Sequence, residues 1–174
     1  MSKRGVPPSG KLVISSIFRD ENILPTLLPL LSEAVGEVCF AGPLLPFDRT
    51  DYYHAEMGKP LFRRFFAASA LVSRDALPEI KIRMEEIEQK FSKDGQRIVN
   101  LDPGLLTPEN FVLATGKNFS HRIYLCNGVF ADLTLIFQKG EYRSLPWTYP
   151  DYASLEIRSL LKELRGSLLQ QCVK

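Results

Sequence analysis

Residues 121–138 have the sequence HRIYLCNGVFADLTLIFQ, which contains the clearest local signal in the chain. Two runs rich in β-branched and aromatic residues flank Asn127-Gly128. Both residues of such a dipeptide accept positive φ, as the type I′ turn of a hairpin requires. We therefore expect two strands, over residues 121–126 and 129–138, joined by a two-residue turn.

A two-residue turn fixes which side chains of the two strands are neighbours. Counting outward from the turn, His121 faces Thr134 and Ile123 faces Asp132, and side chains alternate between the two faces of the sheet. This register places His121, Asp132 and Thr134 together on one face and Arg122 on the other. One bulged residue would break the grouping, because it shifts every later pair.

An imidazole beside a carboxylate is typical of a general base or a metal ligand, because the acid fixes the tautomer of the ring and favours its charged form. His121 and Asp132 are therefore candidate catalytic residues, with Thr134 as a ligand contact. The alternative is a polar cluster on a solvated sheet face, since pairs of histidine and acid are often structural.

Upstream of the hairpin, strand and helix patterns alternate. The helix over residues 75–92 has the strongest pattern, with apolar residues at steps of three and four. The predicted elements are a strand over 12–18, a helix over 20–34, strands over 37–41 and 61–72, the helix over 75–92 and a strand over 96–101. This order is that of the ferredoxin-like arrangement.

The rest of the chain extends this core. The predicted elements are a strand over 111–115, the hairpin, a short strand over 141–145 and a helix over 151–172. We expect an α+β protein in which residues 11–174 form a single domain, with a ferredoxin-like core, a C-terminal antiparallel meander and a closing helix. Residues 1–10 contain two prolines and two glycines and are predicted to be a flexible lead-in.

Two acids outside the hairpin stand at predicted element ends. Asp102-Pro103-Gly104 predicts a type II turn that stops the strand over 96–101. Asp102 is a candidate catalytic carboxylate at this strand end, and the alternative is a turn-initiating residue that bonds its own backbone. Asp151 follows Pro150 and is predicted to be the N-cap of the last helix.

Four basic residues are candidates for binding an anion. Lys117 and Arg122 lie close to His121 in the sequence and could hold a phosphate or a carboxylate. Arg63 and Arg64 are adjacent in a predicted strand, so one of them faces the interior or a cleft. A buried arginine needs an acidic partner or an anionic ligand, and we include Arg64 among the expected ligand contacts.

The composition excludes several classes of protein. The 174 residues are 45% hydrophobic and 24% charged, as in globular proteins, and a net charge of +2 gives no strong signal for nucleic acid. Three widely spaced cysteines without a C-x-x-C pair predict reduced thiols and a cytoplasmic protein. No signal peptide or membrane-spanning run is found, and the glycine-rich phosphate loop, the H-E-x-x-H zinc motif and the Rossmann fingerprint are absent.

Five motifs occur in order along the chain: Tyr52-Tyr53-x-x-Glu56-Met57-Gly58, Arg97-x-Val99-Asn100-x-Asp102-Pro103-Gly104, Leu113-Ala114-Thr115-x-Lys117, His121-Arg122-Ile123-Tyr124-Leu125 and Trp147-Thr148-Tyr149-Pro150-Asp151-Tyr152. Together they resemble the bacterial and archaeal family called domain of unknown function 4416, over nearly the whole chain after the first ten residues.

The resemblance implies a stand-alone, single-domain prokaryotic protein, and it carries no activity, cofactor or functional residue. This chain has Asp132 where members commonly have Glu. Some members are labelled GTP-binding proteins, but this sequence lacks the phosphate loop and the N-K-x-D motif of GTPases.

Our first functional hypothesis is a small enzyme or binding protein for a phosphate-bearing small molecule or nucleotide. The sequence identifies no cofactor or metal, although Asp102 could bind a divalent cation. The expected site contains His121, Asp132 and Asp102 as catalytic groups and Arg122, Lys117, Arg64 and Thr134 as ligand contacts. The alternative is a non-catalytic module that binds a protein or RNA through an open sheet face. The site residues should line one concavity under the first hypothesis and scatter under the second.

Overall fold

The computed structural model describes residues 3–172, and for Lys93 the backbone alone. It contains an antiparallel sheet of nine strands in the order β11-β10-β8-β7-β1-β4-β2, with β3 beside β4 and β9 beside β10, and a separate pair, β5-β6. The strands are β1 (Gly10–Phe18), β2 (Val38–Ala41), β3 (Leu45–Pro46), β4 (Phe62–Val72), β5 (Ser92–Lys93), β6 (Gln96–Arg97), β7 (Val99–Leu106), β8 (Asn110–Thr115), β9 (Arg122–Cys126), β10 (Val129–Gln138) and β11 (Glu141–Ser144). The α-helices are α1 (Leu24–Val35), α2 (His54–Met57), α3 (Leu77–Lys90) and α4 (Leu155–Cys172), so the α+β class is confirmed.

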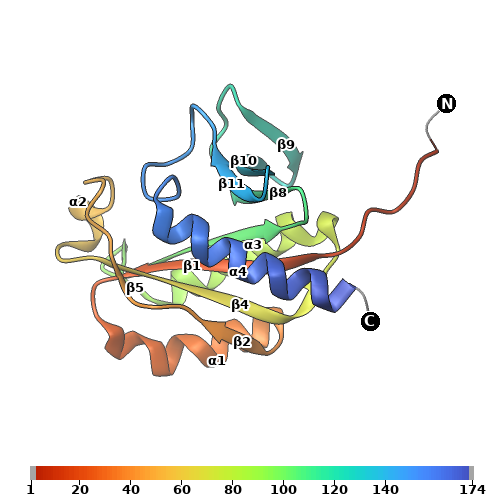
Figure 1. Ribbon diagram of the computed structural model, residues 1–174. Coiled ribbons are helices and arrows are strands. Elements are labelled where there is room, and N and C mark those ends of the chain that lie inside the picture. Colours follow the sequence, from red (N-terminus) through yellow and green to blue (C-terminus); the bar gives the residue numbers. More distant parts are fainter. Residues whose placement is uncertain (1–2, 173–174) are drawn as a thin grey trace.

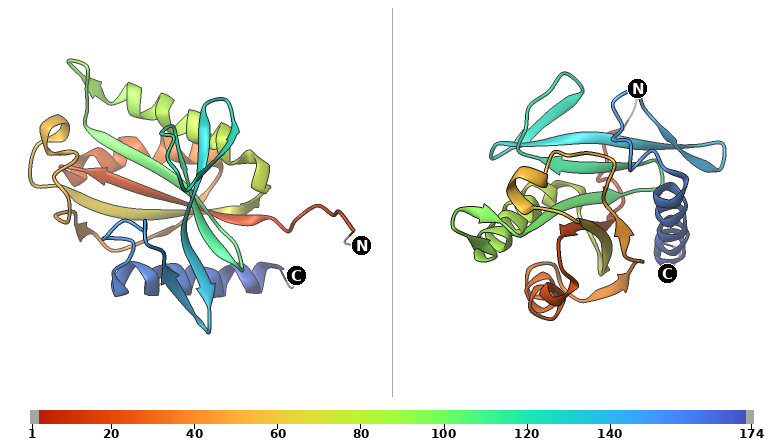
Figure 2. Two further views of the ribbon diagram at one scale, coloured as in Figure 1. Left: turned by 90° about the horizontal axis from the view of Figure 1, so that it is seen from above. Right: turned by 90° about the vertical axis from the view of Figure 1, so that its left-hand side faces the viewer.

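The sheet is covered by helices on both faces. Every residue of β1 is buried, because α1 and α3 pack on one face and α4 packs on the other (Figures 1 and 2). Leu12 and Ile14 belong to the core under α1 and α3, whereas Val13 belongs to the core under α4. The alternation of side chains along a strand therefore divides the core into two layers.

The predicted apolar stripe of α3 is confirmed, with Leu77, Ile80, Met84 and Ile87 buried. The predicted start at residue 75 is slightly early, because Asp75 lies in a single 3₁₀ turn ahead of the helix. The first helix ends at Gly36, where φ is +83°.

The centre of β4 is buried on both faces, as expected for a strand inside a sheet. Its two arginines point in opposite directions. Arg63 is buried and packs among aromatic rings under α4, whereas Arg64 donates from Nε to the Gly42 carbonyl at 2.8 Å and forms an ion pair with Glu21. The prediction that one arginine faces the interior is confirmed.

The predicted turn at Asp102-Pro103-Gly104 is wrong, because β7 runs straight through it. Pro103 pairs with Ile14 of β1, and β7 meets β8 only from Gly104 onward. Proline lacks an N–H, so it is tolerated where a strand has a free edge. Glycine is needed at 104 for a different reason: a Cβ there would lie 2.3 Å from Cζ of Phe111.

The hairpin forms where it was predicted, with φ of 52° at Asn127 and 77° at Gly128. Its predicted register is wrong beyond the first pair. Val129 faces Cys126, but Phe130 faces Tyr124, so Leu125 is an extra residue on β9. Bulges of this kind are common at sheet edges, and β9 is an edge strand.

The last helix begins at Leu155, four residues later than predicted. Ser154 accepts a hydrogen bond from the backbone N–H of Ile157, at 3.3 Å, which is the bond of an N-cap residue. Asp151 is therefore not the cap. Its carboxylate forms an ion pair with Arg63 instead.

The N-terminal segment is shorter than the predicted lead-in of residues 1–10. Residues 1 and 2 of the expected lead-in lie outside the described residues, and Gly10 already belongs to β1. Among residues 3–172, no helix is both long enough and apolar enough to cross a membrane.

Candidate functional site

A cleft of about 780 Å³ lies where two neighbouring strands separate. β7 and β8 pair only along Gly104–Leu106; beyond this point β7 stays beside β1 and β8 stays beside β10. The walls come from both strands, from α3, from the segment before α2 and from the segment before α4. This volume is typical of a small-molecule site.

The lining residues are Phe47, Arg49, Thr50, Tyr52, Tyr53, Arg63, Lys81, Glu85, Glu88, Gln89, Arg97, Asn100, Asp102, Leu113, Ala114, Thr115, Gly116, Lys117, Asp132, Tyr149, Pro150, Asp151 and Tyr152. We call the exposed members the rim and the buried members the floor. Lys81, Glu88 and Asn100 belong to the floor, whereas Tyr52 and Lys117 belong to the rim.

The free edge of β7 is capped by charged side chains of α3. Glu88 accepts a hydrogen bond from the N–H of Leu101 at 2.5 Å, and Nζ of Lys81 donates to the carbonyl of the same residue at 3.2 Å. Both charged residues are buried, with 4% and 6% exposure. Burial raises the pKa of the Glu88 carboxyl above its usual range. These two side chains replace the strand that β7 lacks on this side.

A chain of hydrogen bonds orients Asp102 on the wall of the cleft. Arg97 binds both oxygens of Glu56, at 2.8 Å each, and donates to Oδ1 of Asn100 at 3.1 Å. Asn100 in turn donates to Oδ2 of Asp102 at 2.7 Å. The Arg97 guanidinium holds the pKa of the Glu56 carboxyl below its usual range. The second oxygen of Asp102 lies 3.6 Å from Nζ of Lys81.

Three tyrosines of the cleft stay protonated well above neutral pH. Burial raises the pKa of Tyr53, Tyr149 and Tyr152, and the charge of Asp102 raises each of them further. Their hydroxyl groups are therefore available as hydrogen-bond donors. The hydroxyl of Tyr152 is buried and has no hydrogen-bond partner among the described residues.

Two cationic side chains on the rim form no ion pair with a carboxylate of residues 3–172. Arg63, Lys81 and Arg97 each form an ion pair, but Arg49 and Lys117 form none within residues 3–172. Nζ of Lys117 contacts the hydroxyl of Tyr52 and lies 4.1 Å from the centre of its ring. Free cations beside aromatic rings suit an anionic group on a partly planar ligand.

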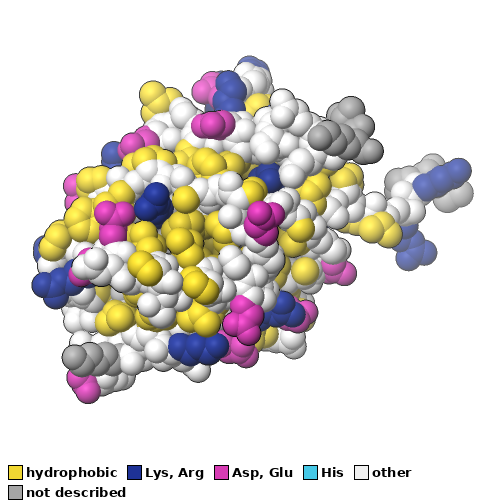
Figure 3. Space-filling model, turned by 90° about the horizontal axis from the view of Figure 1, so that it is seen from below, with side chains coloured by type: hydrophobic (Ala, Val, Ile, Leu, Met, Phe, Trp, Pro, Cys, Tyr) yellow, Lys and Arg dark blue, Asp and Glu magenta, His cyan; other side chains and the backbone are white. Residues whose placement is uncertain are grey.

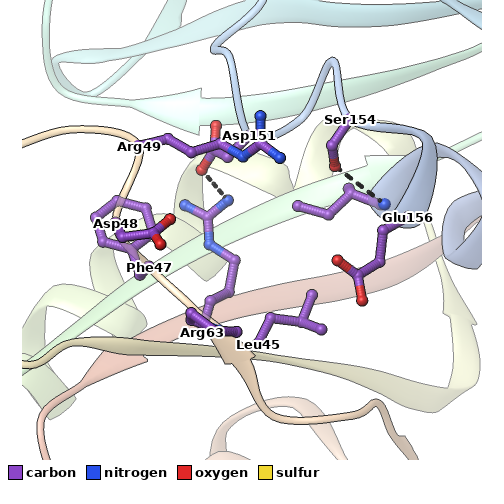
Figure 4. Close-up of a pocket in the computed structure, with 10 residues that line it drawn as sticks. Leu45, Phe47, Asp48, Arg49, Arg63, Asp151, Ser154 and Glu156 are labelled. Carbon is purple, nitrogen blue, oxygen red and sulfur yellow. Dashed lines mark hydrogen bonds and ion pairs between the residues drawn. The ribbon is translucent and has the colours of Figure 1, made fainter.

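Arg63 and Asp151 form a wall that the cleft shares with a second, small cavity of about 30 Å³. Figure 4 shows the guanidinium of Arg63 directed at Asp151, with Arg49 lying across from it. The rings of Phe47 and Tyr152 lie 4.7 and 4.8 Å from the guanidinium carbon of Arg63. The buried charge thus has both an acidic partner and aromatic contacts.

The predicted pair of His121 and Asp132 forms, although not through the predicted register. Nε2 of His121 lies 3.2 Å from Oδ2 of Asp132, and Thr134 donates to Oδ1 of the same carboxylate at 3.3 Å. Arg122 faces Asp132 directly and donates to it from Nε at 2.9 Å, so the predicted separation of these two residues is wrong. His121 precedes β9, and its ring stacks on Trp147.

Arg122 holds two lining residues in place behind the cleft wall. Its other nitrogens donate to the carbonyl of Lys117 at 2.9 Å and to the hydroxyl of Tyr149 at 2.7 Å. Together with its bond to Asp132, this arrangement joins the loop after β8, the strand β10 and the segment before α4. Arg122 is therefore placed to position the wall and not to contact a ligand in the cleft.

The structure brings together part of the predicted site. Asp102, Asp132 and Lys117 line the cleft, whereas His121, Arg122 and Thr134 surround Asp132 without lining it. Arg64 lies on the opposite face of the sheet. Among residues 3–172, no group of three His, Cys, Asp or Glu side chains is placed to hold a metal ion.

The sequence interpretation missed the contribution of α3. Lys81, Glu85 and Glu88 line the cleft, and their spacing of four and three places them on one side of the helix. Two of them are buried, so this polar row continues the apolar stripe instead of facing solvent. The spacing was visible in the sequence, but the burial was not.

A family model for a domain of unknown function, DUF4416, matches residues 8–167. The chain belongs to the DUF4416 family. No curated protein and no solved structure matches it. Residues from four of the five ordered motifs line the cleft, and Arg122 of the remaining motif, His121–Leu125, binds three of its lining residues. The stretches that carry the DUF4416 resemblance therefore meet at one place.

Proposed function

We propose that this DUF4416 protein is a small enzyme or binding protein that takes a phosphate-bearing small molecule, such as a nucleotide or a sugar phosphate, into the cleft between β7 and β8. The single observation that supports this most is the convergence of the motifs on a cleft of about 780 Å³. Unpaired cations on its rim suit the anionic group, and tyrosine rings suit a planar or sugar part.

The test is a thermal-shift measurement on the full chain with nucleoside monophosphates, sugar phosphates and inorganic phosphate. A ligand that binds the folded state raises the melting temperature by mass action. We expect at least one phosphate compound to raise it in the wild type and in Lys162→Glu, a control at an exposed position of α4. Lys117→Glu should abolish the shift. The proposal is wrong if no compound shifts the wild type, or if Lys117→Glu responds equally.

A second candidate, the non-catalytic interaction module, is favoured by apolar side chains at the edges of the sheet. α4 covers one sheet face, so a partner would contact edge strands instead. In β9, Ile123 is 69% exposed and Tyr124 is 59% exposed. Apolar side chains also gather on the face seen from below in Figure 3, where α1 and the edge strand β2 lie. Failure of every phosphate compound would favour this candidate.

We further propose a ferredoxin-like core and a cytoplasmic, prokaryotic origin. The order β7-β1-β4-β2, with α1 and α3 on one face, supports the first part. The three cysteines are exposed and unbridged, which supports a reducing compartment. Measurement of free thiols in protein taken from its native cell would test the cytoplasmic location, and a disulfide there would contradict it.

A further inference from the structure

We propose that Asp102 accepts a hydrogen bond from a hydroxyl or amino group of the ligand, so that the cleft selects sugar phosphates and nucleotides over simple anions. This inference rests on the proposed function and specifies the ligand class. It assigns the anionic end of the ligand to the rim and a donor-bearing end to Asp102.

Asp102 is the lining carboxylate whose orientation is fixed while one oxygen still lacks a close donor. Within residues 3–172, the one donor near Oδ1 is Nζ of Lys81, at 3.6 Å, which is beyond hydrogen-bond length. The side chain retains 27% exposure, so a ligand in the cleft can reach it.

The other lining acids differ from it in one of these respects. Glu88 is bound by Leu101 and Arg97, and Asp151 by Arg63. Asp132 is bound by three side chains, and Glu85 is the most exposed member of the row on α3, with 45% exposure of its side chain.

The orientation of Asp102 is held by a chain of three supporting side chains. Glu56 fixes Arg97 through two bonds, Arg97 fixes the buried Asn100, and Asn100 fixes one oxygen of Asp102. A turn-initiating aspartate would need none of them, and the turn itself does not form. Such support is expected of a residue that must present one oxygen in a defined direction.

The chemistry of the surroundings fits a neutral donor at Asp102. Nζ of Lys81 balances the carboxylate, so a cationic partner is not required. A hydroxyl or amine would donate a charge-assisted hydrogen bond to Oδ1, and the protonated tyrosines nearby could donate to the oxygen of that hydroxyl. Inorganic phosphate bound at the rim has no second, donor-bearing part to reach Asp102 and would leave Asp102 unused.

The test is calorimetric titration of the full chain with ribose 5-phosphate, adenosine 5′-monophosphate and inorganic phosphate. We expect at least one of the two ribosyl compounds to bind wild-type protein at least tenfold more tightly than inorganic phosphate. Asp102→Asn should weaken that binding by roughly 10- to 100-fold, the usual effect of losing a hydrogen bond to a charged group. It should leave the affinity for inorganic phosphate within about twofold, because the rim is unchanged.

Two controls keep the result interpretable. Asp94→Asn lies at an exposed position in the turn between β5 and β6 and should bind all three compounds as the wild type does. Asn100→Ala should weaken ribosyl binding in the same direction as Asp102→Asn, because it releases the carboxylate. The comparison among ligands on the wild type needs no variant, so it stands even if a variant folds poorly.

The outcomes separate the two proposals. If the wild type binds inorganic phosphate and ribosyl compounds equally, and Asp102→Asn changes neither, the role of Asp102 is refuted while the anion site at the rim remains. If the wild type binds none of the three compounds, the proposed function fails and this inference fails with it.

Discussion

The two halves of β7 differ in how their backbone hydrogen bonds are satisfied. Along Gly104–Leu106 it has a neighbour on each side, β1 and β8, and the buried side chains are apolar. Along Val99–Pro103 it has only β1, and its other edge is capped by Lys81 and Glu88. We call Gly104–Leu106 the closed half and Val99–Pro103 the open half. Both halves contribute buried apolar side chains to the core, but only the open half, through Asn100 and Asp102, lines the cleft.

The difference shows how a sheet can open a site without losing its backbone hydrogen bonds. Buried N–H and C=O groups must be paired, because an unpaired group costs about 1–3 kcal/mol. In the closed half the next strand satisfies them. In the open half charged side chains of α3 satisfy Leu101, and the space that the missing strand leaves is available to a ligand.

The largest expected effect tests the cap on the open half. Glu88→Ala removes the buried partner of the Leu101 N–H and one partner of Arg97, which is only partly buried. We expect the free energy of unfolding, measured with urea, to fall by about 3–5 kcal/mol. Glu86→Ala, at an exposed position of the same helix, should change it by less than about 0.5 kcal/mol. A loss below about 1 kcal/mol in Glu88→Ala would mean that water can replace the cap.

A smaller effect tests the closed half. Gly104→Ala places a Cβ 2.3 Å from Cζ of Phe111, so we expect a loss of about 1–3 kcal/mol in the free energy of unfolding. In the Phe111→Leu background, Gly104→Ala should lower the free energy of unfolding by less than it does in the wild-type background, because the ring that collides is gone. A glycine required for positive φ would show no such difference, and that result would restore the predicted turn.

The smallest effect concerns pH and the support of Asp102. Hydrogen bonds from Arg97 lower the pKa of Glu56 in the folded state, below its ordinary value of 4.5. The ion pair therefore stabilises the fold above about pH 4.5, and this contribution is lost as the pH falls through the lower folded pKa.

The melting temperature of the wild type should exceed that of Glu56→Gln at about pH 6, by an amount equivalent to roughly 0.5–1 kcal/mol. The gap should close toward about pH 3. Glu86→Gln, at an exposed position, should show no such gap. A gap that does not depend on pH would mean that the bonds from Arg97 do not require the charge of Glu56.

The sequence predicted most of the elements, because their signals are local. The stripe of α3, the strand at β1 and the Asn127-Gly128 turn all appear where the pattern placed them. It also predicted that one of Arg63 and Arg64 faces the interior or a cleft, because adjacent residues of a strand point to opposite faces. Of the two partners expected for a buried arginine, an acid or an anionic ligand, Arg63 has the acid, Asp151.

The errors arose where a neighbouring strand or helix decides the outcome. Pro103 and Gly104 have the composition of a turn, but β1 holds them in a strand and Phe111 fills the space over the glycine. Asp151 follows a proline and was predicted to be an N-cap. Its carboxylate instead forms an ion pair with Arg63, which lies 88 positions earlier in the chain (151 minus 63). The bulge at Leu125 changed the register, yet His121 still reaches Asp132 because it lies outside the strand.

The sequence by itself determined the α+β class, the family and the motifs, since periodicity, turn chemistry and ordered motifs are properties of the chain. The tertiary structure alone decided which motif residues meet. Asp102 and Lys117 line one cleft because β7 and β8 separate after Gly104, and Arg64 is excluded because it lies on the other face of β4. Separation of strands depends on long-range pairing, for which a single sequence carries no local signal.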